Sequence, residues 1–154
     1  MSPRPRLLIV YHTQSGNTER LAEAVQAGAQ AVAEVEVVLQ RAFATGVADL
    51  AACQGLLLGT PENFGTMSGA VKDLFDRTYY PLEGKMEGVP FAIFVSAGND
   101  GTGAVREIRR IANGYRWKEV AEPVIARREV TEADLARCRE LGEGFASGLA
   151  LGIF

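Results

Sequence analysis

The sequence predicts an α/β domain in which helices cover both faces of a five-stranded, doubly wound parallel sheet. Short apolar runs alternate along the chain with segments of helical period, which is the pattern of such a sheet. The runs are continuously apolar, as expected for strands buried on both faces. A chain of 154 residues suits one core, so we expect a single domain over residues 1–154.

The first half of the chain is expected to form two strands and two helices. An apolar run at 6–11 predicts the first strand, and apolar residues at helical spacing over 18–32 predict the helix that follows. A second strand is expected at 35–39. The alanine-rich stretch after it indicates a short helix at 47–53.

Two further strands and one helix are expected in the middle of the chain. Apolar runs at 55–60 and 89–96 predict the third and fourth strands. Ser68 is a suitable N-cap for a helix between them that runs to about Tyr79.

The last third is expected to hold two helices and a short fifth strand. One helix begins near Gly103, and the strand is expected at 119–125. Thr131 and Asp134 form a capping-box pattern that starts a final helix toward Ala150. We expect the strand order 2-1-3-4-5, in which ligands bind at the carboxyl ends of the strands where the order reverses. The loops after strands 1, 3 and 4 are therefore the candidate site.

Composition excludes several classes of function. The formal net charge of −3 supplies no basic stripe for nucleic acid and no polybasic patch for a membrane. The apolar run at 7–10 is too brief for a membrane span or a signal peptide, so we expect a cytoplasmic protein. Two distant cysteines and a single histidine indicate neither a metal site nor a disulfide.

The loop at 12–18 has the chemistry of a site for a phosphate monoester. Backbone N–H groups at a helix start attract anions, and hydroxyl, amide and glycine residues surround them here. The candidate phosphate ligands are Thr13, Gln14, Ser15, Gly16, Asn17 and Thr18. The loop itself has no lysine or arginine, which favours a tightly wrapped mononucleotide phosphate over a transferable γ-phosphate. A polar capping loop without a ligand is the alternative.

The loops after strands 3 and 4 are expected to hold a planar aromatic ring. An apolar ring at Phe64, on a loop, suits stacking or edge contact with such a ligand, although packing of Phe64 into the core is the alternative. Three glycines in the next loop let main-chain groups face a polar ring edge, although a flexible turn would also use them. The candidate ring ligands are Pro61, Glu62, Asn63, Phe64, Gly65 and Thr66, together with Ser96, Ala97, Gly98, Asn99, Gly101 and Gly103.

The second loop and the helix after it resemble the WrbA-type NAD(P)H:quinone oxidoreductases of the flavodoxin-like superfamily. The resemblance runs through Gly59, Thr60, Pro61, Phe64, Gly65, Met67, Ser68 and Gly69 into a helix that ends LFDRT at 74–78. It implies flavin mononucleotide (FMN), with the phosphate on 13–18, the ring beside 61–66 and its pyrimidine edge near 96–103. The chemistry would take place at flavin N5, so no catalytic side chain and no metal are implied.

The leading hypothesis is an FMN oxidoreductase that takes electrons from NAD(P)H and passes them to a quinone-like acceptor. A flavodoxin-type one-electron carrier that docks on redox proteins is the alternative, and a binding module with an empty site is a third. Glu62 stands where the family usually has arginine, and the segments that help build the family's tetramer are shorter here, so homo-oligomerisation stays open. Arg127 and Arg128 most simply form a solvated face, with a nicotinamide-phosphate contact left open.

Overall fold

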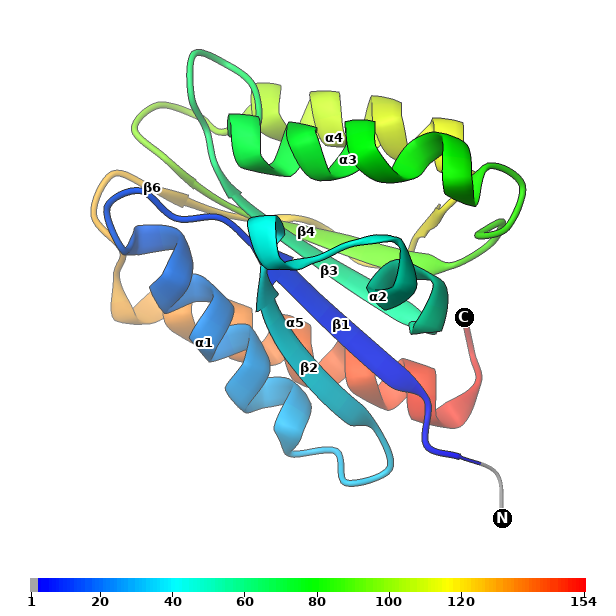
Figure 1. Ribbon diagram of the computed structural model, residues 1–154. Helices are drawn as coiled ribbons and strands as arrows, with labels where there is room; N and C mark the ends of the chain where they lie inside the picture. Colours follow the sequence, from blue (N-terminus) through cyan, green and yellow to red (C-terminus); the bar gives the residue numbers. More distant parts are fainter. Residues whose placement is uncertain (1–2) are drawn as a thin grey trace.

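The computed structural model describes residues 3–154, in which one sheet lies between two layers of helices (Figure 1). Helices α1 (Asn17–Gln30) and α5 (Glu132–Leu151) cover one face. Helices α3 (Gly69–Leu82) and α4 (Thr102–Tyr115) cover the other, with a short helix, α2 (Val47–Ala52), beside them. The expected layering is confirmed.

The sheet is parallel throughout, in the order β2-β1-β3-β4-β5 with β6 also paired to β4. Its strands are β1 (Arg6–Tyr11), β2 (Glu36–Arg41), β3 (Gly55–Pro61), β4 (Pro90–Ala97), β5 (Lys118–Glu119) and β6 (Val124–Arg127). The predicted order is therefore confirmed, and the chain reverses direction across the sheet between β1 and β3, as a ligand site at this edge requires.

The fifth strand differs from its prediction, because the single strand expected at 119–125 is two strands. Phe91 of β4 pairs with Glu119, and Phe94 pairs with Val124, so the edge strand uses two more residues than β4 over the same stretch (124 − 119 = 5 against 94 − 91 = 3). Pro123 lies in this interruption and has no N–H to give to the ladder. After it, β6 continues to Arg127, beside Ala97, which is the last residue of β4.

The other elements end within a few residues of their predicted bounds. A short 3₁₀ helix (Ala42–Ala44) follows β2, and α1 ends at Gln30 instead of residue 32. Helix α3 continues past Tyr79 to Leu82, with Pro81 in its last turn. The Ser68 hydroxyl accepts a bond from the N–H of Val71, which confirms its role as the N-cap.

Alternate residues of the strands supply two cores. Leu8 and Val10 of β1 pack toward α3 and α4, whereas Leu7 and Ile9 pack toward α1 and α5. This two-sided burial is what a continuous apolar run satisfies. The free thiols Cys53 and Cys138 are both buried, and burial raises the pKa of each to about 12. No helix within residues 3–154 has the length and apolar character of a membrane span.

Candidate functional site

Four loops gather at the carboxyl end of the sheet, after β1, β3, β4 and β6 (Figure 1). They enclose a cavity of about 260 Å³. Its walls are Gln14, Ser15, Asn17, Pro61, Glu62, Asn63, Ser96, Ala97, Gly98 and Arg128. All but the last are residues that the sequence singled out. The topology thus brings together three loops that are far apart in the chain.

The first loop provides no side chain that caps the N-terminus of α1, so the backbone N–H groups there are available to an anion. Gly16 is the N-cap residue, with a φ of 95°, and no side chain caps the helix. Such a φ is strained for any residue with a Cβ, which explains the glycine. The N–H of Gly16 donates to Thr13 Oγ1 at 3.0 Å and so closes the loop on itself. The first-turn N–H groups cannot bond within the helix, and the helix dipole adds partial positive charge beside them.

Side-chain hydrogen bonds tie this loop to both of its neighbours. Asn63 Nδ2 donates to Gln14 Oε1 at 2.8 Å, which joins the first loop to the second. The hydroxyls of Thr18 and Ser96 lie 2.8 Å apart, which joins α1 to the third loop. Both residues are buried, so the first role of their hydroxyls is to hold the two segments together.

Glu62 joins the second loop to the third. Its carboxylate accepts hydrogen bonds from the N–H groups of Gly101 and Ala104, each at 3.2 Å. Gly101 is the N-cap of α4 and has no side chain, so Glu62 acts as the cap from another loop. The Glu62 N–H also donates to the Ser96 carbonyl at 2.8 Å. The carboxylate of Glu62 therefore has a structural use, because it joins two loops of the site.

The tip of the second loop is a tight turn that exposes an aromatic ring. Asn63 and Thr66 exchange backbone hydrogen bonds of 2.9 and 3.1 Å, and Phe64 and Gly65 between them have φ values of 51° and 75°. Positive φ at both central residues is the geometry of a type I′ turn. The Phe64 side chain is 107% exposed, so the alternative that it packs into the core is wrong.

The third loop contacts the second loop at Gly103, which packs against the backbone of Gly65. A Cβ at Gly103 would overlap the carbonyl oxygen of Gly65, so the turn packs directly on the start of α4. Gly103 is buried in this contact, Gly101 is buried against Ile125 and Ala97, and Asn99 is exposed. Of the predicted ring ligands, Phe64 and Thr66 do not line the 260 Å³ cavity; together with Asn63 they line a neighbouring hollow of about 620 Å³ on the side of α3 and α4.

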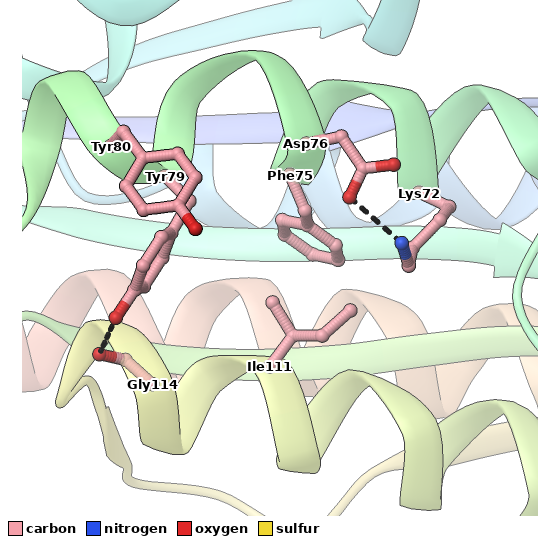
Figure 2. A pocket seen from close by; sticks show the side chains of 7 residues that line it. All are labelled: Lys72, Phe75, Asp76, Tyr79, Tyr80, Ile111 and Gly114. Atoms are coloured by element: carbon pink, nitrogen blue, oxygen red, sulfur yellow. Dashed lines mark hydrogen bonds and ion pairs between the residues drawn. The ribbon is translucent and has the colours of Figure 1, made fainter.

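A further hollow of about 440 Å³ continues between α3 and α4 (Figure 2). Phe75 and Ile111 face it from the two helices, Lys72 Nζ pairs with Asp76 at 2.7 Å, and the Tyr79 hydroxyl donates to the Gly114 carbonyl at 3.4 Å. None of the candidate phosphate or ring ligands lies on its walls, and we assign it no part in the site.

His12 lies at the entry to the first loop. Its backbone N–H donates to the Gly59 carbonyl at 3.2 Å. Its ring meets that of Phe43 edge to face, with centroids 5.9 Å apart. Burial, and then the nearby Arg41 cation, lower the pKa of His12 below its ordinary value of 6.5. The imidazole is therefore neutral at neutral pH and adds no charge to the anion site.

Arg128 is the site residue that sequence reasoning missed. It lines the cavity with the first and third loops, and its backbone N–H donates to the Ala97 carbonyl at 2.7 Å. The sequence interpretation placed it on a solvated face, and Arg128 is indeed exposed to solvent; nothing in its local pattern marks a ligand. Its position directly after the last strand is the one signal that it could reach this edge.

The profile of the family described as NADPH-dependent FMN reductase matches residues 39–132, which is more than half of the chain. The chain belongs to this family. The matched range holds the second and third loops of the site and Arg128, whereas the first loop lies outside it. The expected relationship to flavodoxin-like proteins is confirmed.

Curated relatives carry two kinds of name. A protein named flavodoxin from Aquifex aeolicus is 34% identical over 98 residues, which cover 64% of this chain and 53% of that protein. An NAD(P)H dehydrogenase (quinone) from Acidithiobacillus ferrooxidans is 32% identical over 112 residues, which cover 59% and 56% of the two chains. The chain spans about half the length of these relatives.

Solved structures share the whole fold. An archaeal flavodoxin superposes with a TM-score of 0.83 at 22% identity, covering 94% of this chain and 98% of that one. A WrbA-like protein from Agrobacterium tumefaciens gives 0.81 at 24% identity, covering 96% and 98%. At these identities the likeness establishes the fold.

Proposed function

We propose that this chain binds one FMN at the loop edge of its sheet and carries electrons from NAD(P)H to a quinone-like acceptor. The observation that carries the proposal is the open, glycine-capped N-terminus of α1 beside a cavity that three loops share. A helix start that no side chain caps, with hydroxyls beside it, fits a phosphate monoester.

The residues divide the ligand between them. Residues 13–18 hold the phosphate through backbone N–H groups and the hydroxyls of Thr13 and Ser15. The cavity is smaller than the ~300 Å³ or more of a pocket that encloses a whole ligand, so the ring extends toward the loop tips. There Phe64 offers an exposed aromatic face, and main-chain groups of 96–103 meet the polar edge of the ring.

Bound FMN supplies the redox chemistry itself, and the protein supplies binding and orientation. The net reaction converts NAD(P)H, a proton and a quinone into NAD(P)⁺ and a hydroquinone. The names of two relatives, each NAD(P)H dehydrogenase (quinone), support this assignment. The hydrogen bonds that Asn63 donates to Gln14 and that N–H groups at the start of α4 donate to Glu62 keep the loops in one arrangement for the ligand.

The first experiment is an absorption spectrum of the purified protein, followed by titration with FMN and by NAD(P)H oxidation with and without benzoquinone. We expect tight FMN binding and turnover above that of free FMN at the same flavin concentration. A protein that binds no FMN contradicts the whole proposal. Binding without turnover above free FMN rejects the enzymatic half and keeps the flavoprotein.

A one-electron carrier is the second candidate, favoured by one observation. Phe64 is fully exposed at the tip of a ring-binding loop, where an apolar side chain suits contact with a redox protein. The relative named flavodoxin in Aquifex aeolicus supports it as well. Photoreduction of the FMN complex separates the candidates, because a carrier shows a long-lived one-electron form and a two-electron enzyme does not.

A further inference from the structure

Arg128 stands on the wall that the phosphate loop shares with the third loop. Ser15 and Asn17 line the same cavity from the first loop, and Gly98 lines it from the third. Arg128 also lines an adjoining hollow of about 470 Å³ with Asn17 and Arg20, the latter in the first turn of α1. The arginine therefore lies beside the helix end at which the proposed phosphate binds.

The guanidinium groups of Arg128 and Arg20 have no ion pair and no hydrogen bond within residues 3–154. Other arginines in the same part of the structure are engaged: Arg41 pairs with Glu19 at 2.6 Å, and Arg137 pairs with Asp134. One carboxylate, that of Glu129, lies on the wall of the adjoining hollow and does not pair with either cation. Both arginines are exposed, so solvent and salt screen their charges, but they stand with a helix N-terminus that no side chain caps, and all three attract a dianion.

The backbone at Arg128 is held in a conformation that arginine disfavours. Its φ is 64°, in the left-handed region where glycine is the unstrained residue. The bond from its N–H to the Ala97 carbonyl fixes this geometry at 2.7 Å. Arg116 has a similar φ of 63° as the C-cap of α4, so the φ alone assigns no role; the place of Arg128 on the cavity wall is what singles it out.

We propose that Arg128 is a cationic ligand of the flavin phosphate and the main source of discrimination between FMN and riboflavin. The inference rests on the proposed function and adds a residue to it. It also replaces the expectation from the loop sequence alone, that the phosphate is held without a cation. Arginine suits the task because its planar fork can contact two phosphate oxygens.

The test measures the affinities of the apoprotein for FMN and for riboflavin in wild type and in four variants. Arg128→Gln removes the charge, Arg128→Lys keeps it without the fork, and Arg128→Gly also removes the strain. Arg127→Gln is the matched control, since Arg127 is exposed like Arg128 but lines neither of the two cavities. Thermal melting of each apoprotein checks that the fold is intact.

We expect Arg128→Gln to weaken FMN binding by about tenfold to a hundredfold and to leave riboflavin binding unchanged. Lysine should recover part of the loss. Arg128→Gly should lose FMN affinity while its apoprotein melts at the same or a higher temperature, which no purely structural role predicts. Added salt should weaken FMN binding more in wild type than in Arg128→Gln.

Equal effects of Arg128→Gln and Arg127→Gln on FMN affinity overturn the inference, as does an equal loss of riboflavin affinity in Arg128→Gln. Neither outcome touches the proposed function, since wild type would still bind FMN. A wild-type protein that binds neither flavin rejects both proposals.

Discussion

The hydroxyl oxygens of Thr18 and Ser96 lie 2.8 Å apart, although the two residues are 78 positions apart in the chain. Their residues are only 1% and 6% exposed. The bond joins the first turn of α1 to the end of β4, and so sets the distance between the proposed phosphate loop and the proposed ring loop. A hydroxyl can donate once and accept twice, so the pair retains capacity for a ligand.

Removal of either hydroxyl should destabilise the protein, and because both belong to one hydrogen bond the two losses should not add up. Thr18→Val keeps the side-chain shape and Ser96→Ala removes the hydroxyl; each should lower the free energy of unfolding by about 1–2 kcal/mol, because a buried partner is left unsatisfied. The double variant should lose less than the sum of the single losses. Urea unfolding of the four apoproteins measures this coupling, and strictly additive losses would show that the hydroxyls do not act together.

Glu62 should stabilise the loop edge through α4. Glu62→Gln keeps the shape but removes the charge that caps the helix and one of the two acceptor oxygens. We expect a loss of about 1–2 kcal/mol in the free energy of unfolding and weaker FMN binding, because the second and third loops separate. The exposed Glu143 of α5 supplies the control variant Glu143→Gln. If both variants unfold at the same urea concentration, the cap has no energetic value.

The fold followed from the sequence because the pattern of apolar runs is a local property that tertiary contacts reinforce. The same topology then placed the ends of β1, β3 and β4 together, so three candidate loops could be grouped without coordinates. The split of the fifth strand was not predicted, because the apolar residues on both sides of Pro123 look like one continuous strand.

Side-chain partners across loops were beyond prediction. The position of Glu62 on its loop predicted a ligand. Its two carboxylate oxygens instead accept hydrogen bonds from the N–H groups of Gly101 and Ala104. Arg128 lies on the surface, as the sequence indicated, and only the register of β6 against β4 also brings it to the cavity. The ligand roles of the predicted residues stay predictions that the variants above test.

Gly103 should be required for the contact between the second loop and α4. Because a Cβ there would overlap the Gly65 carbonyl oxygen, Gly103→Ala should push the Phe64 turn away and weaken FMN binding. Gly144→Ala is the matched control, since a Cβ at this helical position meets nothing within 4 Å. The control should gain about 0.5–1 kcal/mol of stability from helix propensity. FMN titration and urea unfolding of both variants decide; an unchanged FMN affinity in Gly103→Ala would show that the turn position is irrelevant to the ligand.

His12 should report directly on the charge of the phosphate site, because it is the one histidine in the sequence and gives one imidazole signal in NMR. Burial and Arg41 lower its pKa, so the apoprotein should titrate below 6.5. With a folded pKa below the unfolded one, the unfolded chain binds the proton more readily. Stability is therefore lost as the pH falls below 6.5, and the loss is complete once the pH is below the folded pKa. His12→Gln should remove this part of the pH dependence in urea unfolding.

Binding of FMN should raise the pKa of His12, since a nearby dianion favours the imidazolium form. Riboflavin carries the same ring without the phosphate and should leave the His12 titration where the apoprotein has it. The same experiment in Arg128→Gln should show a larger rise with FMN, because less of the phosphate charge is neutralised there. A His12 titration that FMN and riboflavin shift equally would mean that the phosphate does not bind beside the first loop.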